Sequence, residues 1–400
     1  MVLKAFKFRC YPTKEQASLI HKTFGCCRFV FNQLLGGQQE RDRQWAISKE
    51  AYEDHQTSQN ACISKTFKKF DNIKKIPLLK KEYPFLKEVD SIALQSSVEH
   101  LADGFDRFYK KQNGKPKFKS KKNPIQSYTT KSVNGNISIN DHYIKISKLG
   151  FLRFAKSREV TGSIKRVILR QNAAGKYFIS VLAETEAVAL PKTEQAVGID
   201  LGLSSFAMFS SGEKIQNHRF FSTLEKQLHK AQRILSRRIQ QALDKGIPLR
   251  EAKNVQKQRI QVAKIHERIR NKRNDFLHKL STQLVKSHDI ICAENLSTKT
   301  LIEGKQYSKS ISDVSWSSFL TMLEYKAVWY GKTFVKVDQA FPSTQLCSTC
   351  GEKNPETKNL SVRSWVCSSC HSLHDRDQNA AHNILIEGLR LLTAGAAGIA

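Results

Sequence analysis

The sequence predicts a mixed α/β protein in which a helical domain interrupts a small β-barrel and a second α/β domain carries a metal-binding insertion. Short β-rich runs separated by turn residues occupy residues 115–186, which suits a small barrel or sheet. Apolar residues at helical spacing recur within residues 14–110. Two Cys-x2-Cys pairs near the end of the chain have the spacing of a metal site.

A first strand is expected at residues 2–10, where apolar residues partly alternate before a turn at Tyr11-Pro12-Thr13. This strand has no local partner, so it could complete the barrel formed by residues 115–186. Thr13 then suits the N-cap of a helix that ends at Gly36-Gly37. The helical domain is therefore expected as an insertion in the barrel.

The second α/β domain is expected after the linker Pro191-Lys192-Thr193. Its pattern predicts a strand, a turn and a strand over residues 196–209, and then two long helices within residues 223–288 that are separated at Gly246-Ile247-Pro248. Two further strands are expected at residues 290–293 and 334–337, with a helix over residues 314–331 between them.

The charge of the chain predicts a polyanionic partner. Its 400 residues include 66 Lys and Arg against 36 Asp and Glu, a formal net charge of +30. Residues 101–300 alone carry +23, since 39 basic residues there face 16 acidic ones. Such an excess indicates nucleic-acid binding with a steep dependence on salt.

Two segments are candidates for this binding. The lysine-rich run 110–122 is explained equally well as a solvated surface. The outer face of the two long helices is a candidate wall for a nucleic-acid channel, and its basic residues are Lys226, Lys230, Arg233, Arg237, Arg238, Lys257, Lys264, Arg268 and Lys272.

Membrane insertion and secretion are not expected. The chain has no uninterrupted apolar run long enough to span a bilayer, and its first ten residues carry Lys4, Lys7 and Arg9 in place of the apolar core of a signal peptide. These features predict a soluble, intracellular protein.

Four of the nine cysteines predict a structural zinc ion. They are Cys347, Cys350, Cys367 and Cys370, and their spacing matches a zinc knuckle in which two short hairpins each supply two thiolates. Gly351 suits the tight turn after the first pair, and Trp365 can pack beside the ion. His371 and His374 are close enough in sequence to be alternative ligands.

Three acidic residues have unusual positions for so basic a chain. Asp200 and Glu294 end apolar strands, and Asp377 opens a final helix. Three carboxylates brought together repel one another unless cations neutralise them, and such a cluster can hold two Mg²⁺ ions for phosphodiester hydrolysis. Structural roles remain open: Asp375 or Asp377 could cap the final helix, and Glu294 could pair with an arginine.

These motifs together resemble the TnpB family, the transposon-encoded RNA-guided nucleases related to type V CRISPR effectors. The resemblance runs nearly end to end, and the later motifs in their order with the cysteine pairs are its most specific part. The matching segments are Arg9-Cys10-Tyr11-Pro12, Gln16, Gly25 to Arg28, Asn32, Leu94-Gln95, Gly198-Ile199-Asp200-Leu201-Gly202, Glu294-Asn295-Leu296, Ser343-Thr344-Gln345-Leu346-Cys347 and Asp375-Arg376-Asp377-Gln378-Asn379-Ala380-Ala381.

The resemblance implies a RuvC-like nuclease domain of RNase H fold that is split in sequence. It would occupy residues 191–345 and 372–400, with the zinc knuckle inserted at 346–371. A wedge-type β-barrel would combine residues 1–13 with 115–190, and the helical recognition domain would occupy 14–114. Asp200, Glu294 and Asp377 would be the catalytic, Mg²⁺-binding residues.

The resemblance also implies the partners. A guide RNA from the transposon end would pair with target double-stranded DNA beside a short motif that the protein reads, and two Mg²⁺ ions would serve the cut. The expected species is a monomeric ribonucleoprotein in the cytoplasm of a bacterium or archaeon, associated with the nucleoid. Expected nucleic-acid contacts are Gln95 and Thr130 at the motif, Lys115, Lys117, Arg233, Arg237, Arg268, and Arg363 with Trp365 along the substrate strand.

Three alternatives remain. A guided DNA binder that has lost cleavage should lack a carboxylate, yet all three are present. A guide-independent transposase or nuclease fits less well with the zinc insertion and the early barrel. A zinc-ribbon transcription factor or RNA-binding protein leaves Asp200 and Glu294 unexplained.

Overall fold

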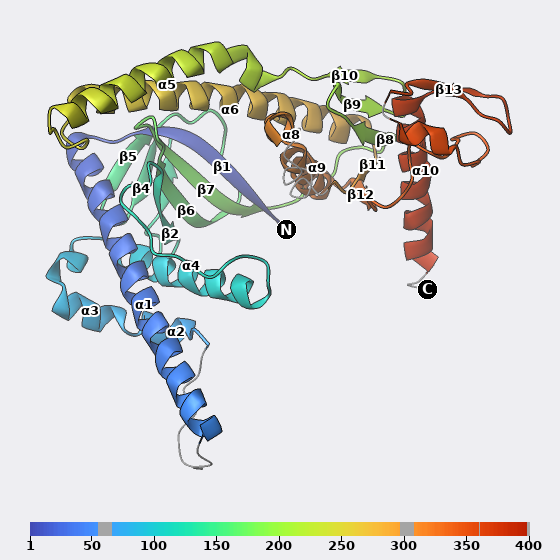
Figure 1. Cartoon of the computed structure of the whole chain (residues 1–400). Coiled ribbons are helices and arrows are strands. Elements are labelled where there is room, and N and C mark those ends of the chain that lie inside the picture. Colours follow the sequence, from blue (N-terminus) through green and yellow to red (C-terminus); the bar gives the residue numbers. More distant parts are fainter. Residues whose placement is uncertain (55–65, 297–307, 360, 398–400) are drawn as a thin grey trace. The chain divides into compact units, whose positions relative to one another are not determined.

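The chain folds into two compact units, Leu3–Glu186 and Ala187–Ala400. The computed structural model describes residues 1–54, 66–296, 308–359 and 361–397 (Figure 1). Each unit is described below by itself. None of the described helices combines the length and the hydropathy that a transmembrane span requires.

A seven-stranded sheet forms the frame of the first unit. Its strands lie in the order β2-β6-β7-β1-β5-β4-β3, so the first strand of the chain occupies an interior position between strands from much later in the sequence. Cys10 of β1 pairs with Phe154 of β5. The strands are β1 (Val2–Tyr11), β2 (Gln126–Lys131), β3 (Ser138–Asn140), β4 (Tyr143–Ile146), β5 (Gly150–Phe154), β6 (Ser163–Gln171) and β7 (Tyr177–Thr185).

The expected closure of this sheet into a barrel is not found. Strands β2 and β3 are the two ends of the order, and no pairing joins them among the described strands. A barrel needs consistent tilt and stagger around the whole ring. Strands β3 and β4 have only three and four residues, which leaves little edge for such a closure. The first strand does complete the sheet, as expected.

The helices of the first unit begin with one long helix. α1 (Lys14–Asp54) continues through Gly36 and Gly37, so the expected stop at these glycines is wrong. An interior glycine costs a helix only about 1 kcal/mol relative to alanine, and neither glycine has a positive φ that would end the helix. The others are α2 (Lys69–Ile73), α3 (Ile76–Glu82), the 3₁₀ turn η1 (Pro84–Lys87) and α4 (Ser91–Tyr109).

One hydrophobic core joins these helices to the sheet. It contains Phe8 of β1, Phe24 of α1, Leu94 and Phe105 of α4, and Leu152 of β5, all nearly inaccessible to solvent. Asp90 begins α4 by accepting a hydrogen bond from the backbone N–H of Ile92. The helical and sheet parts of residues 3–186 therefore fold as one unit.

A five-stranded mixed sheet forms the frame of the second unit, in the order β10-β9-β8-β11-β12. Strands β8, β9 and β10 are antiparallel neighbours, whereas β11 runs parallel to both β8 and β12. The strands are β8 (Ala196–Leu201), β9 (Ser205–Phe209), β10 (Lys214–Gln216), β11 (Ile290–Glu294) and β12 (Thr333–Val337).

Helices cover both faces of this sheet. One core contains Ile199 of β8 and Ala293 of β11 with Leu277 of α6 and Phe319 of α9. On the other face, Cys292 of β11 packs with Ile384 of α10. The helices are α5 (Phe220–Asp244), α6 (Lys253–Ser287), α8 (Ser308–Val314), α9 (Trp316–Tyr330) and α10 (Arg376–Ala397); the 3₁₀ turn η2 (Pro355–Lys358) and the hairpin β13 (Ser364–Val366) and β14 (Leu373–Asp375) precede α10.

Two glycines allow α10 to approach the sheet closely. A Cβ atom added to Gly198 of β8 would lie 2.0 Å from the carbonyl oxygen of Ala381, and one added to Gly388 of α10 would lie 2.3 Å from Sγ of Cys292. Real Cβ atoms do not come so near, so each position requires glycine. Gly198 therefore serves the contact between β8 and α10.

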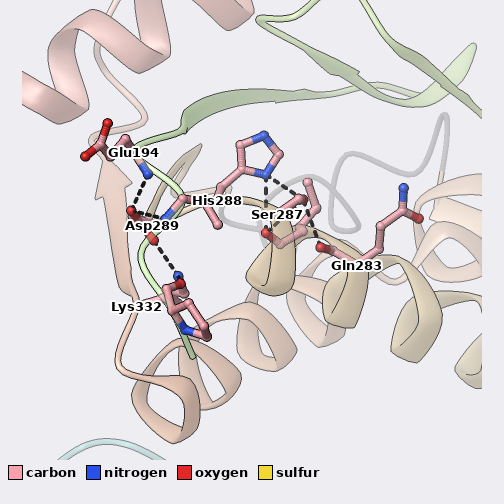
Figure 2. Close-up of polar contacts among 9 residues, drawn as sticks. Glu194, Gln283, Ser287, His288, Asp289 and Lys332 are labelled. Carbon is pink, nitrogen blue, oxygen red and sulfur yellow. Dashed lines mark hydrogen bonds and ion pairs between the residues drawn. The ribbon is translucent and has the colours of Figure 1, made fainter. Parts of the chain in front are cut away.

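An ion pair between the buried Lys332 and the half-buried Asp289 fixes the starts of three strands in the second unit (Figure 2). The carboxylate of Asp289 accepts backbone N–H groups of Thr193, at 2.8 Å, and Glu194, at 2.7 Å, and it also pairs with the Lys332 amino group. Lys332, whose side chain is 2% exposed, donates to the carbonyl of Pro191 as well. The cluster therefore ties the segment before β8 to the residues that precede β11 and β12.

The tight packing of α10 gives a first prediction. We expect Gly388→Ala to lower the free energy of unfolding, because an overpacked core costs about 1–3 kcal/mol, more than the helix propensity that alanine adds. Gly37→Ala is the matched control, since that helical glycine has nothing within 4 Å of the added atom and should be neutral or stabilising. Chemical denaturation of both variants checks this, and equal midpoints would contradict it.

The ion pair at Asp289 gives a second prediction. Its hydrogen bonds with Lys332 hold the pKa of Asp289 well below its usual range, so the stability it contributes is present above the unfolded-state pKa of about 4 and declines as the pH falls further. We expect Asp289→Asn to lower the melting temperature by several degrees at pH 7 and by less near pH 3. Asp141→Asn, at an exposed turn, is the control. A difference in melting temperature between wild type and Asp289→Asn that stays constant with pH would exclude the ion pair as its cause.

Candidate functional site

Strand alternation places two of the three acidic residues on the same face of the second sheet. Asp200 lies two residues after Gly198, which contacts α10, and Glu294 lies two residues after Cys292, which also packs against α10. Side chains two residues apart in a strand share a face. Ile199 and Ala293 are register partners in the parallel pair β8–β11, so both carboxylates lie at the carboxyl ends of these strands, on the side of α10.

The third acidic residue, Asp377, lies in the first turn of α10. Asp375 caps this helix by accepting the backbone N–H of Gln378 at 2.9 Å, so of the two candidates for a capping role it is Asp375 that fills it. Asp377 instead pairs with Arg363, whose Nη1 is 3.6 Å from its Oδ1. Within the described part of the chain, no ion pair joins Glu294 to a basic side chain.

The electrostatics of Asp200 show that two other carboxylates act on it. Burial first, and then the charges of Asp377 and Glu294, raise the pKa of Asp200 to about 7, although Arg376 opposes the shift. Burial also raises the pKa of Glu294. A carboxyl group that resists ionisation beside other carboxylates is the electrostatic signature of a site that a cation would neutralise.

The donor set fits Mg²⁺ in kind, because Mg²⁺ prefers carboxylate oxygens. The oxygen atoms of the three carboxylates are farther apart than the ligand atoms of an assembled metal site. Over the described ranges, only the four cysteines bring three or more potential ligand atoms within 4.8 Å of one another. The structure therefore gathers Asp200, Glu294 and Asp377 at one end of the sheet without closing them around a common point.

Arg376 is a site residue that was not predicted from the sequence. Its side chain is 7% exposed, its Nε has no hydrogen-bond partner, and its positive charge favours the ionised form of Asp200. Its Nη1 reaches only the carbonyl of Asn359, at 3.5 Å. The signal in the sequence was its position between Asp375 and Asp377.

The four predicted zinc ligands come together in the second unit. The sulfur atoms of Cys347 and Cys370 are 3.6 Å apart, as are those of Cys350 and Cys367. Zn–S bonds of about 2.3 Å in a tetrahedron give sulfur–sulfur distances of about 3.8 Å. The cluster therefore has the size of a structural zinc site, and four thiolates would leave no open position on the ion.

The surroundings of the cysteines support this role. Gly351 and His371, each directly after a cysteine pair, adopt the left-handed conformation with φ of 79° and 57°, which closes the two tight turns. Trp365 is buried beside Cys347 and Cys367, as expected. Nε2 of His374 lies 3.1 Å from Sγ of Cys347, so this histidine is positioned as a hydrogen-bond partner of a ligand, which commonly orients metal-bound groups.

Two asparagines of α10 hold the start of the cysteine segment. Asn379 donates to the carbonyl of Leu346 at 2.7 Å and accepts the backbone N–H of Ser348 at 2.9 Å. Asn383 donates to the carbonyls of Ser343 and Leu346. The helix that carries Asp377 is thus hydrogen-bonded directly to the chain segment that supplies Cys347.

The predicted basic contacts lie mostly at the surface. Arg233, Arg237 and Arg268 are exposed on α5 and α6, and Lys117 is exposed in the first unit. Lys115 is exposed but pairs with Asp42 at 2.6 Å. Arg238, predicted on the outer face, instead donates to the carbonyl of Asn254 and to Gln258, which joins the two helices.

The two residues expected at the adjacent motif differ in accessibility. Gln95 is exposed on α4. Thr130 has no exposed surface, and its hydroxyl donates to Asp90 at 2.5 Å. In this structure the Thr130 hydroxyl therefore serves the contact between β2 and the start of α4.

Three family models match parts of the chain. A helix-turn-helix model of the OrfB IS605 group matches residues 1–44, and a model of the same group described as a probable transposase matches residues 178–303. The Cas12f1-like TNB domain matches residues 316–384, which include the four cysteines. Together these models match segments in both units.

Proteins with similar sequences extend over nearly the whole chain. A protein of Streptomyces pristinaespiralis, provisionally named an RNA-guided DNA endonuclease, is 37% identical over 98% of this chain and 91% of its own length. The Escherichia coli K12 protein InsQ, with the same provisional description, is 29% identical over 98% of this chain and 94% of its own length.

Among solved structures, a chain from the cryo-EM structure of a Cas12f1–sgRNA–target DNA complex matches with a TM-score of 0.49 and 16% identity. The match covers 96% of this chain and 98% of that chain. So loose a match does not assign residues of one chain to residues of the other.

The cysteine cluster gives a third prediction. We expect Cys367→Ser to reduce bound zinc from about one equivalent to nearly none and to make residues 343–375 sensitive to protease, because structural zinc contributes about 10–16 kcal/mol in small zinc-dependent modules. Ser369→Ala, an exposed non-ligand in the same segment, should keep the metal. Metal analysis and limited proteolysis check this, and a zinc-free wild-type protein of unchanged stability would overturn it.

Proposed function

Because the chain belongs to the TnpB family of RNA-guided DNA endonucleases, we propose that it cuts target double-stranded DNA under the direction of a guide RNA from its transposon end. The observation that carries the proposal is the position of Asp200 and Glu294 on one face at the carboxyl ends of β8 and β11, where the charges of Glu294 and Asp377 both act on Asp200. A guided DNA-binding protein that no longer cleaves would be expected to lack one of these carboxylates, and this chain has all three.

We assign these three residues to metal-dependent hydrolysis. Mg²⁺ ions, when bound, supply a nucleophilic water and stabilise the leaving oxygen. Asp200 and Glu294 extend from neighbouring strands, so the sheet sets their separation, whereas Asp377 comes from the first turn of α10, which is packed closely against the sheet. Because burial and neighbouring charges disfavour the ionised form of Asp200, a bound cation would stabilise this carboxylate more than it would stabilise an isolated aspartate.

Two arginines complete the proposed site. Arg363 pairs with Asp377 across 3.6 Å, and its side chain is 59% exposed, so it can leave that carboxylate for a DNA phosphate. Arg376 is buried, and its positive charge favours the ionised form of Asp200. Trp365 is buried beside the cysteines and contributes packing.

The finer architecture is also proposed. The mixed sheet, with three antiparallel strands followed by two parallel ones and a helix on each face, supports an RNase H-like, RuvC-type nuclease domain at residues 191–345 and 372–400. The cysteine segment 346–371 is its inserted knuckle. Residues 14–114 would recognise nucleic acid beside a wedge-type sheet made from 1–13 and 115–190.

Charge supports the proposed partners. An RNA scaffold together with an RNA–DNA duplex presents many phosphates, which suits a net charge of +30. Base pairing would supply most of the specificity, while Gln95, and Thr130 if β2 shifts, would read the adjacent motif. Phosphate contacts are proposed for Lys115, Lys117, Arg233, Arg237 and Arg268. The proposed species is a monomeric ribonucleoprotein at the nucleoid of a bacterial or archaeal cell.

The nuclease proposal gives a fourth prediction. In a ribonucleoprotein assembled with RNA transcribed across the transposon end, we expect Asp200→Asn to reduce DNA cleavage at least about 1,000-fold, because carboxylate–metal contacts supply several kcal/mol to the transition state. Guide RNA and target DNA should bind nearly as well as with wild type. Asp141→Asn should cleave normally, and loss of binding by Asp200→Asn would indicate a structural role.

A stability measurement separates the two roles further. The folded-state pKa of Asp200 is raised, so the ionised group opposes folding as the pH rises from about 4 to about 7. In EDTA at pH 8, Asp200→Asn should therefore melt at a higher temperature than wild type, and Mg²⁺ should narrow the difference. A variant that melts lower under both conditions would contradict the assignment.

A further inference from the structure

The seven-stranded sheet of the first unit has one packed face and one face open to solvent. In β1, Phe6, Phe8 and Cys10 are buried, whereas Lys7 and Tyr11 are exposed. Strands β4 and β5 alternate in the same way, and their inward residues belong to the core. Antiparallel sheets commonly have one solvated face of this kind. The name open face is used below for the outward side chains of Lys7, Arg9, Tyr11, Tyr143, Lys145, Phe151, Arg153, Arg170 and Phe178.

Aromatic and basic residues alternate across the open face. Tyr143 of β4 pairs with Arg153 of β5, and Arg153 pairs in turn with Tyr11 of β1. In the next row, Lys145 of β4 pairs with Phe151 of β5. Directly paired residues point to the same face of a sheet. Each of these aromatic rings therefore has a cationic side chain as its neighbour on the adjoining strand.

The same alternation continues beyond β1. The guanidinium carbon of Arg9 lies 5.7 Å from the ring centre of Tyr11 and 5.3 Å from that of Phe178 on β7. Nζ of Lys7 lies 4.8 Å from the Phe178 ring centre, and Arg170 of β6 is the register partner of Phe178. A guanidinium that already lies against two rings has less freedom to lose when it binds an anion.

Three of the rings on the open face are accessible to a ligand. Tyr11 is 52% exposed, Tyr143 47% and Phe151 56%. Over the described residues, none of the three is in ring–ring contact with another aromatic side chain, so they do not stabilise the sheet by packing on one another. Single exposed apolar side chains are ordinary, but several on one face of adjoining strands are typical of a binding surface.

The charge of these strands indicates an anionic ligand. Strands β1, β4, β5, β6 and β7 contain only one acidic residue, Glu184, which pairs with Lys165 at 2.6 Å. Against it stand the basic residues Lys4, Lys7, Arg9, Lys145, Arg153, Lys165, Arg166 and Arg170. Nucleic acid combines phosphates for these cations with flat bases for the rings, and a duplex would hide the faces of its bases.

We infer that the open face binds an unpaired segment of the guide RNA, an inference that rests on the proposed function because that function supplies the RNA. Bases stack on Tyr11, Tyr143 and Phe151. Phosphates contact Arg9, Lys145 and Arg153, which lie between and beside the rings. The segment lies outside the part of the RNA that pairs with target DNA, since paired bases cannot stack on a side chain in this way.

The test measures binding of the full chain to RNA transcribed across the transposon end, at several salt concentrations. We expect Tyr143→Leu to weaken binding about tenfold, or about 1.4 kcal/mol, with an unchanged salt dependence because no charge is lost. Tyr143→Phe keeps the ring and should bind like wild type. Arg153→Gln should lower the slope of log Kd against log salt by about 0.7.

Phe70→Leu is the matched control. Phe70 is 70% exposed and has Lys69 Nζ 4.7 Å from its ring centre, but it lies on α2, outside the sheet. This variant should bind RNA like wild type. The residues changed on the open face are exposed, so the melting temperatures of all four variants should match that of wild type.

Ultraviolet crosslinking of the wild-type ribonucleoprotein with bound target DNA gives a second readout that needs no variant. Tyr11, Tyr143 or Phe151 should crosslink to unpaired nucleotides of the RNA. Crosslinks from these residues to DNA alone or to paired RNA would overturn the inference. Equal RNA affinity of Tyr143→Leu and wild type, or an equal loss in Phe70→Leu, would also overturn it.

Guided cleavage by wild type, measured at saturating RNA, separates this inference from the nuclease proposal. Cleavage by wild type together with unchanged RNA binding by Tyr143→Leu would remove the open face as an RNA site and leave the nuclease proposal intact. Weakened RNA binding by Tyr143→Leu, in a protein whose wild type does not cleave, would do the reverse.

Discussion

The close contact between α10 and the centre of the second sheet is the constraint on which the candidate site depends. Gly198 and Gly388 remove two Cβ atoms that would otherwise hold the helix away. Because the helix lies so near, Asp377 in its first turn comes within electrostatic reach of Asp200. The other face of the sheet is filled by α6 and α9, so the strands cannot move away to relieve the repulsion between the carboxylates.

The candidate site is an acidic cluster inside a strongly basic chain, and the proposed cleavage of DNA accounts for both properties. Basic side chains on α5 and α6 can attract a nucleic-acid backbone, but phosphate and carboxylate repel each other where they must meet. Metal ions bound between the two groups usually remove this repulsion. In the protein alone, the nearby Arg363 and Arg376 offset the negative charge of the carboxylates. Residues that oppose folding in this way are stabilised by the packing around them.

Local signals in the sequence predicted where the main residues of the candidate site lie in the fold. The ends of apolar strands located Asp200 and Glu294, and spacing located the four cysteines, because both patterns depend on a few neighbouring residues. Predictions of features that depend on residues far away in the sequence were wrong, or were not made at all. Closure of the first sheet depends on whether β2 meets β3, and the burial of Thr130 depends on Asp90, 40 residues earlier. The roles of Asn379 and Asn383 depend on backbone carbonyls 33 to 40 residues away.

The interior position of β1 has a consequence for synthesis of the chain. Strand β1 is synthesised well before its neighbours β5 and β7, which end at Phe154 and Thr185. At about 5–20 residues per second, roughly ten seconds or more pass before the last of these strands is available. During that time Phe6 and Phe8 have no sheet to enter, so the nascent chain exposes an unpaired apolar strand, the kind of segment that chaperones bind.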